Sequence, residues 1–454
     1  MGKKYENCEF EIKAIEFPNK GIGVWDGKEV AVKNVIPGQV ICADVKKKKQ
    51  KYEGRLKAVV KRADYEGEPT CPDFEICGGC TYRTIAYEKE LEFKRDMVLK
   101  LLADGGIDGF VYDGIKGSPD TECYRNKMEF SFGDNGEAGE LCLGMRRRNS
   151  NYEVVNADKC SLTHADVGKI VGAVIDFFRG TDETFYHRMR HTGTLRHLLV
   201  RRGFFTGQIL VGIVTTSQVK ADLNALKDKI LSLDLEGSVE GILHIINDGV
   251  ADVVRADEIR QLYGKDWFYE NLLGLKFKVS IFSFFQTNSA GAEVLYSTVR
   301  DYAGSGEGKT IFDMYCGTGT IAQLMSKNAD RVVGIELVEE AVEAAKVNAA
   351  LNGIDNCEFI AGDVLKMVDN LDVKPDIMIL DPPREGIHPK AIDKLINFYA
   401  DRIVYVSCKA SSMAKDLTVF VQNGYKVERV VNVDMFPHTA HVESICLLSK
   451  KSAE

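Results

Sequence analysis

The sequence predicts an α/β protein whose C-terminal part forms a doubly wound, mostly parallel sheet, preceded by a small β-barrel and a mixed α+β region. The first observation is an alternation that begins near residue 308. Short apolar runs such as KTIFDMY, RVVGIEL and DIMILD are each separated from the next by a helical segment, which is typical of parallel sheets. The second observation is length, because 454 residues exceed what one hydrophobic core usually holds.

Residues 1–66 indicate a barrel of the OB type. Short β-rich segments, including CEFEIKAIEF and GRLKAVVKRA, are separated by turns that contain Gly or Pro. This part holds 15 Lys and Arg against 10 Asp and Glu, whereas the whole chain has a net charge of −8. The lysine run 46–49 is therefore either a solvated loop or a contact for a polyanion such as RNA.

Residues 67–285 are expected to form a central α+β domain, and residues 286–454 the domain with the parallel sheet. The central segment begins with a cysteine-rich stretch and the helical run YEKELEFKRDMVLKLLADGG. The order of its later strands and helices stays open. Its arginines, such as those at 146–148, fit either charged edge strands or phosphate contacts.

Composition also restricts the compartment. No run approaches the roughly 20 uninterrupted apolar residues that a membrane helix needs, and the start, MGKKYENCEFEIK, lacks the apolar core of a secretory signal. We therefore expect a cytoplasmic protein without membrane contact. In that reducing compartment, the 12 cysteines are expected to be thiols, metal ligands or catalysts rather than disulfides.

A nucleoside-containing ligand is expected at the carboxyl ends of the parallel strands. The segment DMYCGTGT at 313–320 lies between a strand and a helix, and its glycines allow a tight turn and close approach to a ligand. It is not G-x-G-x-x-G, which disfavours a dinucleotide. Glu336 ends the second strand and suits ribose hydroxyls, and Asp363 follows the third strand and suits an adenine edge.

Three cysteines at the start of the central segment indicate a metal site. Cys71, Cys77 and Cys80 lie within ten residues, and three thiolates need a fourth ligand from elsewhere. Structural zinc and iron–sulfur clusters both accept four cysteinates, so the spacing leaves zinc, iron–sulfur and no metal open.

Residues with chemical potential also follow the fourth and fifth strands. The fourth is followed by DPPREG at 381–386, and the fifth by Ser407 and Cys408; FPHTAHVE at 436–443 comes near the end. A cysteine after a strand is commonly a small buried hydrophobe. Its place beside the expected ligand site favours a reactive thiol instead.

These motifs together resemble the RNA (uracil-5-)-methyltransferase family, and the similarity extends to SFFQTN at 283–288 and CYRNKMEF at 123–130. A TRAM barrel followed by a cysteine cluster is similar to the members that methylate 23S ribosomal RNA. The resemblance implies S-adenosyl-L-methionine as methyl donor and RNA, expected to be ribosomal, as partner. DNA and an obligate protein partner are not expected.

The resemblance also implies residue roles. Cys408 would attack carbon 6 of uracil and Glu443 would remove the proton of carbon 5. Cys160 would be the fourth ligand of a [4Fe–4S] cluster, and whether this cluster is structural or contacts RNA stays open. The cofactor-binding positions that it implies are Gln286, Tyr315, Thr320, Glu336, Asp363 and Asp381. The chain departs from the family after the nucleophile, where Lys-Ala-Ser-Ser at 409–412 replaces the usual Asn-Pro-x-Thr.

Three other functions stay open. One is a transfer-RNA uridine methyltransferase, against which the barrel and the cysteine cluster weigh, because such members typically lack both. Another is a non-catalytic RNA-binding iron–sulfur protein, which the intact Cys408, Glu443 and Asp381 disfavour. The last is a flavin- or folate-dependent uridine methylase, which the glycine loop and Glu336 disfavour. The target uridine, the number of targets and the oligomeric state cannot be predicted from the sequence.

Overall fold

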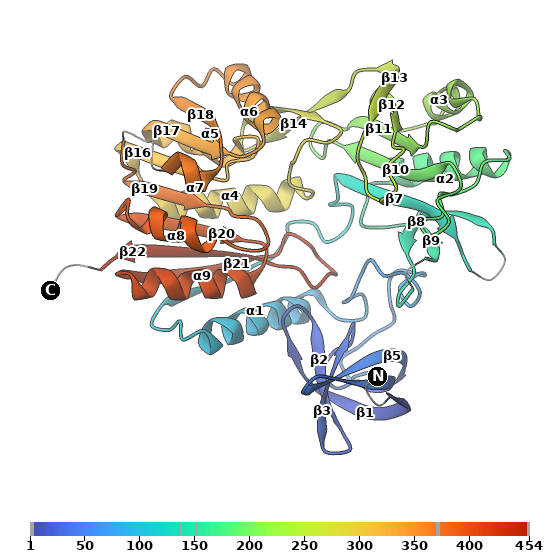
Figure 1. Ribbon diagram of the computed structural model, residues 1–454, viewed down its shortest axis with the longest axis horizontal. Helices are drawn as coiled ribbons and strands as arrows, with labels where there is room; N and C mark the ends of the chain where they lie inside the picture. Colours follow the sequence, from blue (N-terminus) through green and yellow to red (C-terminus); the bar gives the residue numbers. More distant parts are fainter. Residues whose placement is uncertain (1–3, 137–138, 151, 369–372, 452–454) are drawn as a thin grey trace.

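The computed structural model describes residues 4–136, 139–150, 152–368 and 373–451. Figure 1 shows three bodies: a small barrel at the N-terminus, a mixed sheet in green, and a layered α/β unit in orange and red. The α/β class, the parallel C-terminal sheet and the N-terminal barrel that the sequence predicts are all confirmed.

The N-terminal barrel closes from five strands in the order β1-β2-β3-β5-β4. Alternate residues of β1 point inward, among them Cys8, Phe10 and Ile12, as the two-residue period of a strand requires. Closure leaves no unpaired edge among these strands. Their bounds are β1 (Lys4–Glu16), β2 (Lys20–Trp25), β3 (Lys28–Lys33), β4 (Val40–Lys48) and β5 (Lys51–Lys61).

The central body is a seven-stranded sheet in the order β13-β12-β11-β10-β7-β8-β9. Two amphipathic helices, α2 (Ala165–Arg179) and α3 (Leu223–Leu231), cover one face with their apolar sides. The other face shares a core with the hairpin β14–β15 and the C-terminal body. The strands are β7 (Lys127–Asp134), β8 (Leu141–Arg146), β9 (Val154–Asn156), β10 (Leu195–Arg202), β11 (Gln208–Thr215), β12 (Ser238–Ile246), β13 (Glu258–Gly264), β14 (Trp267–Leu272) and β15 (Leu275–Ser280).

The C-terminal body is an eight-stranded sheet in the order β18-β17-β16-β19-β20-β22-β21-β6. The five strands from β16 to β20 are parallel, and β22 runs antiparallel between β20 and β21. Their bounds are β6 (Val111–Lys116), β16 (Gly306–Met314), β17 (Ala329–Glu336), β18 (Cys357–Ala361), β19 (Ile377–Leu380), β20 (Arg402–Ser407), β21 (Tyr425–Val433) and β22 (Glu443–Lys450).

Helices cover both faces of this sheet, so its strands are apolar on both sides. One face carries α4 (Ser289–Ala303), α5 (Thr320–Met325) and α6 (Glu339–Leu351). The other carries α1 (Tyr87–Asp104), α7 (Val364–Met367), α8 (Pro389–Ile396) and α9 (Ala410–Gln422). A 3-10 turn at Ser326–Asn328 precedes β17. Within the described residues, none of these helices is both long and apolar enough to cross a membrane.

One segment lies elsewhere than the sequence suggests. Residues 87–116 belong to the segment 67–285 that is expected to form the central domain, but β6 pairs in parallel with β21 and forms one edge of the C-terminal sheet. The preceding helix α1 buries Val98 and Leu102 in the core of the same sheet (Figure 1). The apolar stripe of α1 and the open edge of β21 explain this placement, because both need cover. Residues 87–116 therefore join the C-terminal body although they precede the central sheet, and the domain boundaries at 66 and 285 stay predictions.

Candidate active site

Strand register gathers the candidate residues at one edge of the C-terminal sheet. Met314, at the end of β16, pairs with Leu380 at the end of β19, and Leu380 pairs with Tyr405 near the end of β20. Because β22 runs the other way, its first residues meet the last residues of β20, with Ser407 opposite Ser444. The residues next to these positions, Asp381, Cys408 and Glu443, therefore reach the same edge from distant parts of the sequence.

The glycine loop after β16 has the tight conformation that the sequence predicts. Tyr315, Gly317 and Gly319 all have positive φ, at 68°, 54° and 73°. A Cβ atom at Gly319 would lie only 2.6 Å from the ring of Phe359, so glycine is required there. The left-handed backbone of Tyr315 is uncommon for a large side chain, and such conformations concentrate at functional sites.

The loop is fastened to the second strand by Glu336. One carboxylate oxygen accepts from the amide of Gly317 at 3.0 Å, and the other accepts from the amide of Val338 at 3.0 Å. These bonds fix the carboxylate beside the glycine loop at the carboxyl end of β17. Asp363 caps α7 by accepting from the amide of Leu365 at 2.9 Å. Burial and the charge of Asp363 both raise the pKa of Tyr315.

Four acidic side chains share the space beneath this loop. Burial raises the pKa of Asp381 to about 7, and burial together with the charge of Asp381 raises the pKa of Glu443 to about 8. Asp313 is completely buried, and its pKa lies well above the ordinary value because of burial and the charges of Asp381 and Glu336. A cation placed among these carboxyl groups would be favoured electrostatically, because it would relieve their mutual repulsion.

Asp313 is also a structural support. One of its oxygens accepts from the amide of Ala322 at 2.9 Å, which ties α5 to the end of β16. Its other oxygen has no hydrogen-bond partner among the described residues. Thr320 begins α5 and is buried beside this contact. The strand, the glycine loop and the helix are thus held as one unit.

The thiol of Cys408 lies between opposite charges. Burial raises its pKa, and the carboxyl of Glu443 raises it further, while a hydrogen bond and the positive charge of Arg384 lower it. The backbone carbonyl of Arg384 accepts from Ser412 at 2.7 Å, so the loop after β19 is fastened to α9. Arg384 is the cation next to the thiol that can stabilise a thiolate.

The segment before α4 completes the site. The side chain of Gln286 hydrogen-bonds to Tyr296, a buried residue of α4 whose pKa is raised by burial and by Asp381 and Glu443. The backbone carbonyl of Gln286 accepts from Asn126 at 2.8 Å. This bond joins the segments SFFQTN and CYRNKMEF, which lie far apart in the sequence.

The structure brings together most of the residues that the sequence singles out. The charges of Asp381 and Glu443 affect the thiol of Cys408. The same two carboxyl groups and the side chain of Gln286 lie near Tyr296. Tyr315 interacts with Asp363 at the side of the glycine loop. Sequence reasoning gave no separate role to Arg384, Asp313 or Tyr296. Arg384 and Asp313 lie within the motifs DPPREG and DMYCGTGT, which could have pointed to them. Tyr296 has the pattern of an ordinary core residue of a helix.

The cysteines at the start of the central segment lie near Cys160. Burial raises the pKa of Cys77, Cys80 and Cys160, and each of these thiols is also affected by the charge of another member of the set. The charge of Cys71 contributes to the raised pKa of both Cys77 and Cys160. In the described part of the chain, however, no three His, Cys, Asp or Glu side chains form a group that could hold a metal ion.

Three arginines surround these cysteines. Arg83 hydrogen-bonds to the thiol of Cys80, and the guanidinium of Arg148 donates to the carbonyl of Cys80 at 2.8 Å. The Nε atoms of Arg83, Arg125 and Arg148 are buried and have no hydrogen-bond partner among the described residues. Buried unpaired donors are costly, and an anion among the cysteines would satisfy them.

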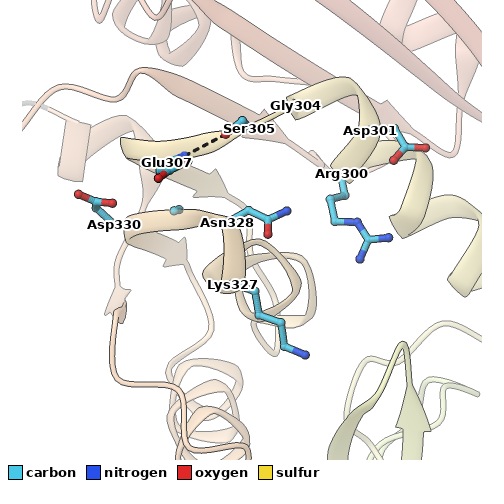
Figure 2. A pocket seen from close by; sticks show the side chains of 9 residues that line it. Arg300, Asp301, Gly304, Ser305, Glu307, Lys327, Asn328 and Asp330 are labelled. Atoms are coloured by element: carbon cyan, nitrogen blue, oxygen red, sulfur yellow. Dashed lines mark hydrogen bonds between the residues drawn. The ribbon is translucent and has the colours of Figure 1, made fainter.

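A surface pocket of about 750 Å³ lies elsewhere (Figure 2). Its lining comes from the end of α4 and the starts of β16 and β17, including Arg300, Glu307 and Asp330. This is the amino-terminal end of the parallel strands, opposite the edge that carries Cys408. Ligands of open α/β sheets bind at the carboxyl ends, so this pocket is not the expected ligand site.

Comparison with known proteins identifies the family. The family model described as tRNA (Uracil-5-)-methyltransferase matches residues 86–451. The chain belongs to this family. An uncharacterized RNA methyltransferase of Clostridium acetobutylicum is 51% identical over 450 residues, which cover 99% of each chain. Another, from Caldanaerobacter subterraneus subsp. tengcongensis, is 46% identical over 98% of this chain and 99% of its own length.

A solved structure extends the comparison to the whole architecture. The Pyrococcus abyssi tRNA (uracil-54, C5)-methyltransferase, in complex with S-adenosyl-L-homocysteine, has a TM-score of 0.77 and 26% identity. It covers 97% of this chain and 100% of its own chain. The protein is therefore an S-adenosylmethionine-dependent RNA (uracil-5-)-methyltransferase, and the non-catalytic alternative is wrong.

One inference from the sequence needs correction. The barrel was expected to weigh against a transfer-RNA substrate. An enzyme named for tRNA covers 97% of this chain, which leaves about 14 of the 454 residues uncovered, far fewer than the barrel strands between Lys4 and Lys61 contain. The N-terminal barrel therefore does not separate ribosomal-RNA from transfer-RNA methyltransferases.

The variant Gly319→Ala tests the glycine loop of the methyltransferase. We expect at least about tenfold weaker binding of S-adenosylhomocysteine, because a left-handed alanine costs about 1–2 kcal/mol and its Cβ would collide with Phe359. Isothermal titration calorimetry measures the affinity. Gly353→Ala is the matched control, since Gly353 also has positive φ but nothing lies within 4 Å of its Cβ position. Equal affinities of the two variants would contradict the expectation.

The variant Glu443→Gln tests the burial of the carboxyl group. The pKa of about 8 in the folded protein lies above the ordinary 4.5, so the folded state binds this proton more tightly and stability falls as pH rises between the two values. Glutamine does not ionise, and we expect it to stabilise the protein by on the order of 2 kcal/mol near pH 8. Near pH 4.5 the difference should vanish. Urea unfolding at both pH values measures it, and a difference that does not depend on pH would disprove the assigned burial.

Proposed function

We propose that this methyltransferase modifies carbon 5 of a uridine in 23S ribosomal RNA, with Cys408 as the nucleophile and Glu443 as the base. The observation that carries this proposal is that the thiol, the buried carboxyl and Arg384 meet at one sheet edge, where β19 and β20 end and β22 begins. Carbon 5 of uracil is a weak nucleophile, and a thiolate bound at carbon 6 turns it into an enolate carbon.

The first step needs Cys408 as a thiolate. Arg384 supplies the positive charge and the hydrogen bond that favour this form. The sulfur forms a bond to carbon 6, and the electrons of the carbon 5–carbon 6 double bond move toward the carbonyl at carbon 4. The negative charge moves from the sulfur to the uracil ring, and the guanidinium of Arg384 stays close to it. The uracil must be rotated out of its stack to reach the thiol.

The second step needs Glu443 as a base. S-adenosylmethionine supplies the methyl group that carbon 5 takes. The carboxylate of Glu443 then removes the proton of carbon 5, the double bond reforms, and the bond between carbon 6 and the sulfur of Cys408 breaks. A pKa of about 8 for Glu443 suits proton removal near neutral pH. A carboxylate with a pKa near the working pH is strongly basic, and a useful fraction of it is still ionised.

The carboxylates around the glycine loop are suited to the methyl donor. The donor carries positive charges, and a cation beside Asp381, Asp313 and Glu336 would favour the ionised forms of these carboxyl groups. We propose that Glu336 and Asp363 hold the nucleoside part, and that Gln286, Tyr315, Thr320 and Asp381 contact the remainder. The resemblance of these six positions to the family motifs supports this assignment, as does the position of Tyr315, Glu336 and Asp381 at the carboxyl ends of β16, β17 and β19.

The choice of ribosomal RNA rests on the resemblance of the cysteine-containing sequence to ribosomal-RNA enzymes. The basic barrel, with the lysine run at 46–49, is suited to contacts with RNA phosphates. Transfer RNA is the second candidate, because the structurally similar Pyrococcus enzyme is named for tRNA. The two substrates require the same chemistry at Cys408.

We also propose that Cys71, Cys77, Cys80 and Cys160 hold a [4Fe–4S] cluster. The donor set fits in charge: four buried or half-buried thiols lie beside three arginines whose unpaired N–H groups could donate to cluster sulfides. Bound there, the cluster would cross-link the segment 71–80 to Cys160. It has no part in methyl transfer.

Two substitutions test the roles in catalysis. We expect Cys408→Ala to abolish methylation while affinity for S-adenosylhomocysteine changes less than about threefold, because the thiol acts on the uracil. Glu443→Gln should accumulate a covalent protein–RNA adduct, seen as a slowly migrating band on a denaturing gel. Activity of the alanine variant would rule out the nucleophile. Normal turnover by the glutamine variant without an adduct would rule out the base.

The RNA substrate is tested by mapping 5-methyluridine. Ribosomal and transfer RNA are compared between cells with and without the gene, and each RNA is then offered to the purified enzyme. We expect one or more positions in 23S ribosomal RNA to lose the modification, with transfer RNA unchanged. Loss confined to transfer RNA would instead establish the second candidate.

The cluster is tested by metal analysis of protein purified without oxygen. We expect about four iron and four sulfide per chain, and Cys80→Ser or Cys160→Ser should lose them. Cys123→Ser, at an exposed cysteine outside the proposed set, is the control and should keep its iron. Zinc in place of iron would show a structural zinc site, and protein without metal would refute both.

A further inference from the structure

A triad of charged side chains is buried between α1 and the loop that leads to Glu443. The ammonium of Lys94 donates to the carboxylate of Glu90 at 2.6 Å and to that of Asp434 at 2.7 Å. All three side chains are fully buried. Burial raises the pKa of Glu90 to about 7, which shows how strongly this site is shielded from water.

Buried ion pairs are poor devices for stability. Removing such charges from water costs several kcal/mol per ion, and apolar side chains of similar size often do as well or better. A triad at the centre of a fold therefore needs a geometric explanation. Here the partners come from α1 and from the residue that follows β21, which are more than 300 positions apart in the sequence.

The triad fastens the backbone of the loop 434–442. Lys94 donates to the carbonyl of Phe436 at 3.2 Å, and Asp434 accepts from the amide of Phe436 at 3.0 Å. Glu90 accepts from the amide of His438 at 2.7 Å. Each member of the triad thus binds a backbone group of this loop, in addition to another member.

The opposite side of the loop is held by residues next to the cysteine segment. The carbonyl of His438 accepts from the amides of Thr81 at 2.7 Å and Tyr82 at 3.2 Å, directly after Cys80. Tyr124 donates to the carbonyl of Pro437 at 3.0 Å. These bonds hold His438 at a φ of 66°, which a histidine seldom adopts.

The loop has little freedom between these supports and the catalytic edge. Thr439 accepts from the amide of His441 at 3.3 Å and donates to the carbonyl of Phe436 at 2.8 Å, which makes a compact turn. Two residues after His441, β22 begins with Glu443. A displacement at Phe436 or His438 would therefore be passed along a short, hydrogen-bonded segment to the carboxyl group.

We propose that Glu90, Lys94 and Asp434 are positioning residues for methyl transfer, which fix the loop 434–442 and thereby place the carboxyl of Glu443 for proton removal. The inference rests on the proposed role of Glu443 as base. The triad touches neither uracil nor methyl donor, and its effect on the reaction passes through the backbone of the loop. It predicts a defect in one step, release of the product from Cys408.

The test is the double variant Lys94→Met with Asp434→Asn. It removes one cation and one anion, so the formal charge of the triad is unchanged, and it deletes the bond from Lys94 to Phe436. The matched control is Lys89→Met with Glu92→Gln, which removes a half-exposed ion pair of 2.7 Å from the same helix. Glu443→Gln is measured beside both.

Each variant is mixed with an excess of methyl donor and target RNA, and the covalent adduct is followed with the released product. We expect the triad variant to form the adduct at nearly the normal rate and to release it at least about tenfold more slowly, because small misplacements of a catalytic group cost this much or more. Affinity for S-adenosylhomocysteine and the behaviour of the control should match the wild type. A variant that was merely destabilised would lose adduct formation and release together.

The outcomes separate the inference from the function on which it rests. If Glu443→Gln accumulates the adduct and the triad variant does not, the triad is not a positioning device. If Glu443→Gln accumulates none, the proposed base itself is wrong. Should the double variant fail to fold, Tyr87→Phe decides, because it deletes one hydroxyl, which donates to Asp434 at 2.9 Å and accepts from the amide of Ser118 at 2.8 Å, and leaves the three charged side chains in place. Slower release by that variant supports the inference, and unchanged release overturns it.

Discussion

The sheet edge that carries Cys408 depends on carboxyl groups that lie close together, two of which, Asp313 and Glu443, are buried. Asp313, Asp381 and Glu443 repel one another, and burial removes the solvent that would screen them. The fold tolerates this because each group is fixed by backbone: Asp313 by the amide of Ala322, Asp381 by its place after β19, and Glu443 by the first pair of β22. Burial, together with the charge of Asp381, also raises the pKa of Glu443 to about 8, as the proposed role of a base would require. Burial of these carboxyl groups close to one another is expected to lower the stability of the folded protein.

The positive charge of Arg384 partly offsets the charges of these carboxyl groups. This positive charge lowers the pKa of both Cys408 and Glu443, so it favours the thiolate and the carboxylate. The backbone carbonyl of Arg384 accepts from Ser412, which lies in the segment that differs from the Asn-Pro-x-Thr motif expected from the family resemblance. The altered segment Lys-Ala-Ser-Ser at 409–412 therefore still supports the loop of Arg384, through a serine hydroxyl.

Periodicity and motifs were sufficient to predict the barrel, the parallel sheet and the position of most candidate site residues at one edge of that sheet. Strand alternation fixes which residues lie at carboxyl ends, and this rule places Glu336, Asp381 and Cys408 correctly at one edge. Glu443 could be placed only by resemblance, because its strand is antiparallel and local pattern does not reveal which neighbour it takes. Tyr296 and Lys94 were not foreseen, since a buried tyrosine and a helix lysine carry no sign of their distant partners.

The position of β6 limits how this enzyme can be assembled or divided. The edge strand Val111–Lys116 pairs with Tyr425–Val433, so the ribosome must synthesise nearly the whole chain before that ladder can close. Until then α1 and β6 have no partner sheet, and their apolar sides are available to chaperones. A fragment cut before α4 would leave β21 with an open edge and the sheet face under α1 uncovered. Chimeras between relatives must therefore exchange residues 87–116 together with the C-terminal body.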